Sequence, residues 1–105
     1  MHPLAEAASA GRAGEEAAQA VENLGTKEYF KAGGRSRFTD GSTSTAVNEV
    51  KNVARQGWTQ QLKDEAGHAA ATSRTFQLWV RSSTELSGPL KAAVNALQVV
   101  IRILP

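Results

Sequence analysis

The stretch AVNEVKNV, residues 46–53, decides the fold, because it is the clearest strand in the chain. Alternate residues of a strand point to opposite faces, so Val47, Glu49 and Lys51 share one face and the residues between them share the other. A carboxylate and an ammonium group therefore lie side by side on one surface of a predicted sheet. The remaining helices and strands are predicted from the residues before and after this strand.

Apolar spacing and turn residues predict further elements on both sides of this strand. Their ranges are a helix over 15–24, strands over 29–32 and 35–39, a helix over 58–71, a strand over 75–80, a helix opened by Ser87-Gly88-Pro89, and a strand over 99–104. The order α-β-β-β-α-β-α-β contains no internal repeat. It predicts an α/β fold in which helices flank a mixed central sheet.

The composition indicates one folded domain. The chain has 105 residues, of which 41% are hydrophobic and 21% charged. Such a length and composition suit a single globular core. Residues 1–13 are rich in alanine, glycine and serine, so we expect a flexible or linker-like segment there and a single domain over 14–105. The opening residues lack the pattern of a signal peptide, and no apolar run approaches the ~20 residues of a membrane span.

The absence of cysteine excludes disulfide scaffolds and thiolate metal sites, and it fits work in a reducing cytoplasm. The net charge of +2 is unevenly distributed: residues 1–28 hold five acids and two bases, and residues 29–105 hold five acids and ten bases. The excess of bases in residues 29–105 suits a polyanionic partner such as nucleic acid. Arg35, Arg37 and Arg55 are candidate phosphate contacts, with exposed surface charge as the alternative interpretation.

The residue types around the central strand suit phosphodiester hydrolysis. That reaction needs a nucleophilic water and positive charge at the phosphate, and carboxylates commonly hold Mg²⁺ for this purpose. Glu49 supplies one carboxylate, and Asp40, at the end of the preceding predicted strand, is close enough to share a metal with it. Lys51 can orient the water or stabilise the developing charge. A surface ion pair of these groups is the alternative interpretation.

Five blocks extend this pattern along the chain. They are Thr39-Asp40, Asn48-Glu49-Val50-Lys51-Asn52-Val53, Thr59-Gln60-Gln61-Leu62-Lys63-Asp64, Leu78-Trp79-Val80-Arg81 and Leu86-Ser87-Gly88-Pro89-Leu90. In order and approximate spacing they resemble the PD-(D/E)xK restriction-endonuclease-like superfamily. The similarity is closest to the C-terminal toxin domains of bacterial polymorphic toxins of the Rhs and contact-dependent inhibition types.

This resemblance implies a fold and a set of roles. The fold is a restriction-endonuclease-like αβββαβ core with an additional C-terminal helix and strand. Asp40 and Glu49 become ligands of Mg²⁺ or Mn²⁺, and the Val50 carbonyl becomes a possible further ligand. Lys51 becomes the catalytic lysine, and Gln61 lines the site and touches the phosphate or the water.

The family often adds an acid from its first helix to the metal shell. The candidates are Glu15 and Glu16, and a helical wheel favours Glu16, which lies nearer the predicted buried stripe. The chain departs from the family pattern at Thr39, where the family usually has proline. Because that proline is a backbone preference and not a catalytic group, the departure weakens the motif only slightly.

The function expected from this resemblance is a metal-dependent nuclease toxin acting on DNA in interbacterial competition. The domain would be part of a larger secreted effector, act in the cytoplasm of a target bacterium and be neutralised by a cognate immunity protein. An RNase or tRNase of the same fold is the alternative, because both nucleic acids present the same phosphodiester. A non-catalytic interaction module is the alternative from another class.

Overall fold

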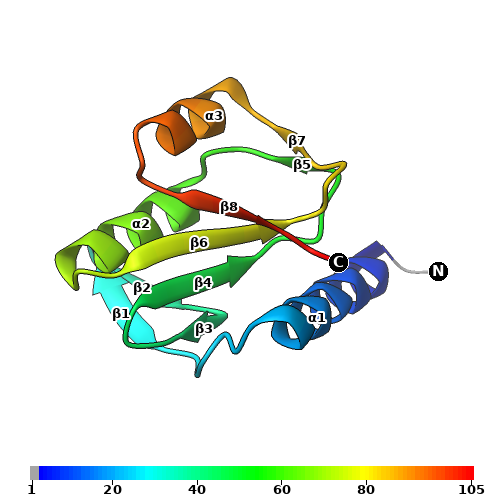
Figure 1. Cartoon of the computed structure of the whole chain (residues 1–105), viewed down its shortest axis with the longest axis horizontal. Coiled ribbons are helices and arrows are strands. Elements are labelled where there is room, and N and C mark those ends of the chain that lie inside the picture. Colours follow the sequence, from blue (N-terminus) through cyan, green and yellow to red (C-terminus); the bar gives the residue numbers. More distant parts are fainter. Residues whose placement is uncertain (1–2) are drawn as a thin grey trace.

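The computed structural model describes the backbone of residues 3–105 and the side chains from Ala10 onward, and this part forms three helices and eight short strands (Figure 1). In chain order the elements are α1 (Pro3–Val21), β1 (Tyr29–Ala32), β2 (Arg35–Phe38), β3 (Gly41–Ser42), β4 (Ala46–Val50), β5 (Arg55–Gln56), α2 (Gln60–Ala71), β6 (Thr75–Val80), β7 (Glu85–Leu86), α3 (Gly88–Asn95) and β8 (Val100–Ile103). The expected α/β class is confirmed.

The central sheet has the strand order β3-β4-β6-β8. β3 runs antiparallel to β4, whereas β4, β6 and β8 are mutually parallel, so the sheet is mixed as expected. Every residue of β4 is buried, because β3 and β6 flank its edges and both of its faces are covered. Within the register, Gly41 lies opposite Asn48 and Glu49 lies opposite Leu78.

Two apolar clusters cover opposite faces of this sheet. The cluster between the sheet, α2 and α3 contains Val47, Leu62, Ala69, Phe76, Leu78, Val80, Leu90, Ala93 and Val99. The cluster on the α1 side contains Ala18, Leu24, Val50, Trp79 and Leu104. The alternation expected for β4 is therefore confirmed, since Val47 and Val50 belong to different clusters. Glu49, which alternates with Val47, faces α2.

The first helix begins at Pro3, not near residue 15 as its apolar pattern predicted, so residues 3–13 belong to α1 and not to a linker. Alanine is the strongest helix former, which favours helix through this stretch despite its small side chains. Tertiary contact also holds it, because the Asn52 side-chain amide donates to the Ala10 carbonyl at 2.7 Å. Residues 1 and 2 lie outside the described part. Among the described residues, no helix combines the length and apolar character needed to cross a bilayer.

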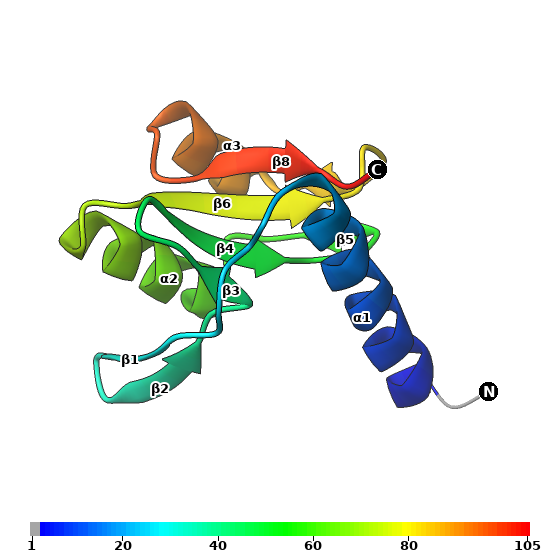
Figure 2. The ribbon, with the colours of Figure 1, turned by 60° about the horizontal axis from the view of Figure 1, so that its bottom comes forward.

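β1 and β2 form a hairpin that is a separate two-stranded sheet. The sequence had predicted both as strands of the central sheet. Figure 2 shows the hairpin as an arm beside α2. Its inner face contacts α2: Phe30 stacks on His68 with ring centroids 4.1 Å apart, and Arg35 binds Asp64. The two-residue strand β3 takes the place beside β4, and β5 and β7 form a second small sheet.

Gly25 and Gly41 allow the chain before β1 to approach β3 closely. A Cβ added at Gly41 would collide with the backbone oxygen of Leu24, and one added at Gly25 would collide with that of Ser42. Gly25 also has a φ of +82°, which glycine adopts without steric cost. This approach fixes β3, and with it the neighbouring Asp40.

Replacement of Gly41 by alanine should therefore destabilise the fold. Gly41→Ala is expected to lower the free energy of unfolding by about 1–3 kcal/mol, because the new methyl group meets backbone that cannot rotate away. The matched control is Gly67→Ala, in α2, where an added Cβ meets no heavy atom within 4 Å. That change should raise stability by roughly 0.5–1 kcal/mol through helix propensity. Urea denaturation measures both, and equal stability of Gly41→Ala and the wild type would contradict the close approach.

Candidate functional site

Asp40 is placed beside the end of β4 by the backbone of β3. Its amide donates to the Asn48 carbonyl at 3.1 Å, and its carboxylate oxygen Oδ2 accepts from the Val50 amide at 2.7 Å. The preceding residue, Thr39, is held by Glu28: its amide donates to the Glu28 carbonyl at 2.9 Å, and its hydroxyl accepts from the Glu28 amide. A proline at this position could not donate the first of these bonds.

Glu49 and Lys51 extend from β4 toward α2, where Gln61 joins them. The Lys51 ammonium donates to Oε1 of Gln61 at 3.0 Å, and the Gln61 amide donates to Oε1 of Glu49 at 3.2 Å. The Lys51 nitrogen lies 3.8 Å from that same Glu49 oxygen. Gln61 thus bridges an acid and a base, and the four residues Asp40, Glu49, Lys51 and Gln61 gather at one end of β4.

Glu65 is a further acidic residue of the site that the sequence-based analysis did not assign to it. It lies one helical turn after Gln61, so the two side chains share a face of α2. Its side chain is completely buried, and Glu49 is 3% exposed. The spacing in the sequence could have indicated this, because Glu65 follows Gln61 by four residues and therefore faces the strand that Gln61 faces.

Burial has the largest effect on the pKa values of Glu49 and Glu65. Burial raises the pKa of the Glu49 carboxyl, and the neighbouring carboxyls of Glu65 and Asp40 raise it further. Burial also raises the pKa of Glu65, and the charge of Asp40 adds to this rise, whereas the charges of Lys51 and Arg37 act in the opposite direction. Two buried carboxyl groups in contact cannot both carry charge cheaply, so this arrangement favours protonation or a bound cation.

Carboxylate oxygens of Glu49 and Glu65 that lack a hydrogen-bond partner are available to a metal ion. Within residues 3–105, Oε2 of Glu49 and both carboxylate oxygens of Glu65 are buried and have no hydrogen-bond partner. No group of three acidic or histidine side chains in this part of the chain is already arranged around a metal position. Mg²⁺ needs fewer protein ligands than three, because it commonly takes one or two carboxylates and completes its octahedron with water and phosphate. The donor set of Asp40 and Glu49 fits that requirement.

On α1, the structure favours Glu15 over Glu16, which corrects the preference drawn from the helical wheel. Both glutamates line a hollow shared with Asp40. Glu15 is half-buried there, and burial followed by the charge of Asp40 raises the pKa of Glu15, whereas Glu16 is exposed. The wheel was referred to Leu24, which lies beyond the end of α1 at Val21, whereas the buried residues of the helix, among those described, are Gly14 and Ala18. Lys27, which the sequence did not single out, lies 3.9 Å from Asp40.

The three candidate phosphate-binding arginines lie in two separate places. Arg35 binds Asp64 through two nitrogens at 2.8 and 2.9 Å, and Arg37 binds the same carboxylate at 2.9 Å. These bonds hold the pKa of the Asp64 carboxyl well below its usual range and attach the hairpin to α2. Arg55 lies on β5 and pairs with Glu85, and both side chains are mostly exposed. Asp64 therefore pairs with Arg35 and Arg37, and Arg55 lies apart from them.

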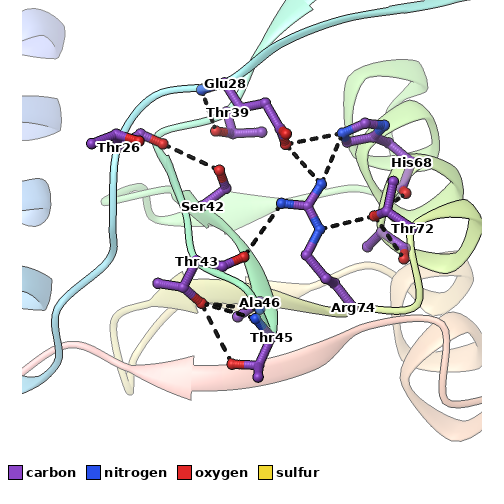
Figure 3. A network of polar contacts seen from close by, with 11 residues as sticks. Thr26, Glu28, Thr39, Ser42, Thr43, Thr45, Ala46, His68, Thr72 and Arg74 are labelled. Atoms are coloured by element: carbon purple, nitrogen blue, oxygen red, sulfur yellow. Dashed lines mark hydrogen bonds and ion pairs between the residues drawn. The ribbon is translucent and has the colours of Figure 1, made fainter.

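A polar network fastens the base of the hairpin to the rest of the domain (Figure 3). Glu28 accepts from Arg74 at 2.8 Å and lies 3.0 Å from the His68 ring nitrogen. Arg74 also donates to the Thr43 carbonyl in the turn between β3 and β4. His68 therefore has a structural role, as a single histidine on a helix face usually does. The network fixes the hairpin relative to both α2 and the strand that carries Glu49.

The mixed sheet, the acid beside β4 and the Glu-x-Lys triplet at the end of β4 define a restriction-endonuclease-like fold. The chain belongs to the family described as restriction endonuclease fold toxin 7, which it matches over residues 11–90. The match includes Asp40, Glu49, Lys51 and Gln61 and ends within α3. No curated protein and no solved structure matches the chain. Membership indicates a nuclease toxin, in agreement with the coarse function expected from the sequence.

Removal of the Glu65 charge should stabilise the metal-free fold. Because burial raises the pKa of Glu65 above its ordinary 4.5, the unfolded chain loses this proton first as pH rises, and wild-type stability falls above that pH. In EDTA, Glu65→Gln should therefore raise the free energy of unfolding by about 1–3 kcal/mol near pH 8, and by less near pH 4.5. Chemical denaturation at the two pH values measures the difference.

The control is Glu85→Gln, since the Glu85 side chain is 73% exposed. This exposed change should alter stability by no more than about 0.5 kcal/mol at either pH. A Glu65→Gln variant that gained nothing near pH 8 would show that Glu65 does not carry a buried, unpaired charge.

Proposed function

We propose that this domain is a Mg²⁺-dependent endonuclease toxin that hydrolyses phosphodiester bonds, with DNA as its preferred substrate. The observation that carries the proposal is the burial of Glu49 with an orphaned oxygen, beside Asp40 and within 3.8 Å of the Lys51 ammonium. Burial of unpaired carboxylates destabilises a fold, so such a group is characteristic of a functional site. Membership of a restriction endonuclease fold toxin family supports the reaction class.

Asp40 and Glu49 would hold the Mg²⁺ or Mn²⁺ ion, and the Val50 carbonyl is a possible further donor. When bound, the ion supplies positive charge at the scissile phosphate and lowers the pKa of water. The Asp40 carboxylate is oriented for this role by the Val50 amide, which engages only its Oδ2 atom. Glu15 is the residue of α1 best located to join these acids, since it is half-buried in the hollow that it shares with Asp40, whereas Glu16 is exposed.

Lys51 would act on the phosphate directly. Its ammonium has three donors, of which Gln61 engages one, so others are free to meet a phosphate oxygen or orient the attacking water. Gln61 is a positioning residue in this scheme, because its amide joins Lys51 to Glu49 and holds both side chains in one geometry. A fixed ammonium stabilises developing negative charge without reorganisation during the reaction.

The biological setting is proposed from the toxin family. The domain would be delivered as part of a larger secreted effector, act in the cytoplasm of a target bacterium and be neutralised by a cognate immunity protein. Rhs and contact-dependent inhibition systems are the delivery routes with which the sequence pattern is associated. A supercoiled-plasmid nicking assay beside a tRNA cleavage assay distinguishes the proposed DNA substrate from RNA.

Loss of Lys51 should abolish cleavage while the fold survives. Lys51→Ala is expected to reduce the rate by roughly 100-fold or more, because it removes a fixed donor from the transition state. The matched control is Lys63→Ala, an exposed lysine of α2, which should cleave like the wild type. Rates are measured on plasmid and tRNA with Mg²⁺, Mn²⁺ or EDTA, and circular dichroism checks the fold. Intact nucleic acid under all three conditions, or equal rates for the two variants, would refute the proposed enzyme.

A further inference from the structure

Two large aromatic side chains lie exposed on the outer face of the β1–β2 hairpin. Tyr29 and Phe38 are direct cross-strand partners, and they are 50% and 62% exposed. Their ring centroids are 5.2 Å apart and their planes are inclined by 54°. The Tyr29 hydroxyl is tethered to the Ser36 hydroxyl at 3.2 Å. We refer to Tyr29 and Phe38 together as the aromatic pair.

The aromatic pair cannot turn inward, because the other face of the hairpin is already occupied. Phe30 is buried against His68, and Arg35 and Arg37 are bound to Asp64. Strand alternation therefore keeps Tyr29 and Phe38 on the solvent side. The pair is preorganised on a rigid support, which lowers the entropic cost of binding a partner.

The charge around the aromatic pair favours a polyanion. Residues 27–38 contain four bases and the single acid Glu28, a net charge of +3. Arg35 and Arg37 are bound to Asp64 on the inner face, so Lys27 and Lys31 are the bases that remain to meet a polyanion. Lys31 is exposed and alternates with Phe30, so it shares the outer face with Tyr29. The Lys27 side chain is 62% exposed. Aromatic rings among cationic side chains are the combination with which proteins bind single-stranded nucleic acids.

The aromatic pair also adjoins the candidate active site. Phe38 is the last residue of β2, and Asp40 follows two residues later, a span of about 7 Å along an extended chain. Lys27 lies 3.9 Å from Asp40 and so connects the basic surroundings of the pair with the acids. A strand whose base rests on the pair would have its backbone within reach of Asp40.

We propose that the aromatic pair stacks on an unpaired nucleobase beside the scissile phosphate, so that the enzyme prefers single-stranded or locally unpaired nucleic acid. In a duplex the base faces are covered by their neighbours, and an aromatic side chain can stack only on a base that is free. This inference rests on the proposed nuclease function, because it assigns the substrate class of the same site. It applies equally to DNA and RNA, since both carry bases with exposed faces when unpaired.

The test measures binding separately from cleavage. Fluorescence anisotropy in EDTA, where strands stay intact, gives the Kd of the full chain for a single strand of about 12 nucleotides, a duplex of the same length and an abasic strand with the same phosphates. The variant is Tyr29→Leu with Phe38→Leu, which keeps apolar bulk and removes both ring faces. Both side chains are exposed, and thermal unfolding confirms that the fold survives. The control is Leu97→Ala, which alters a side chain that is 88% exposed beside the far edge strand β8.

The double variant should weaken single-strand binding by roughly 5- to 100-fold, the range expected for loss of one stacked base. Its affinity for the abasic strand and the duplex should change less than about twofold, as should all three affinities in the control. Equal loss for ordinary and abasic strands, or no loss at all, would overturn the inference and leave this face to a protein partner. Selective base binding without cleavage in Mg²⁺ would refute only the nuclease, and cleavage without base-dependent binding would refute only the aromatic pair.

Discussion

Glu49 and Glu65 place two neighbouring carboxyl groups between β4 and α2, where both are buried. Within the described residues, three of their four oxygens have no hydrogen-bond partner. Such burial opposes folding, because an unpaired polar group retains the full cost of its desolvation. The apolar clusters on both faces of the sheet must offset this cost. We propose that these acids serve a ligand, and a divalent cation is the ligand that would supply the missing charge.

The remaining contacts of the site serve to keep these acids in place. β3 brings Asp40 alongside β4, and Gly41 permits the close approach of the Leu24 backbone that holds β3 in place. Gln61 joins Lys51 to Glu49 across the gap between strand and helix. The hairpin is fastened to α2 through the arginine bonds of Asp64, next in sequence to Glu65. The site is thus assembled from β3, β4 and α2, and none of these elements could bring the groups together alone.

Local patterns predicted much of this arrangement. The alternation in residues 46–53 predicted the buried strand and the shared face of Glu49 and Lys51, although the strand itself ends at Val50. Helical spacing predicted α2 with Gln61. The independent hairpin and the start of α1 were not predictable in the same way, because they depend on contacts between distant residues such as Arg35 with Asp64 and Asn52 with Ala10. Glu65 was missed for a different reason. An acid within an apolar stripe fits a structural interpretation until the facing strand is known to present a second acid.

The central claim is that the buried carboxylates form a cation site, and calorimetric titration of Mn²⁺ into the metal-free chain tests it most directly. Mn²⁺ should bind saturably to the wild type, fail to bind to Glu49→Gln, and bind unchanged to Glu85→Gln, whose side chain is exposed on β7. Because the assay needs no substrate, it does not depend on which nucleic acid the enzyme cleaves. Absence of binding to the wild type, or equal affinity in Glu49→Gln, would contradict the account.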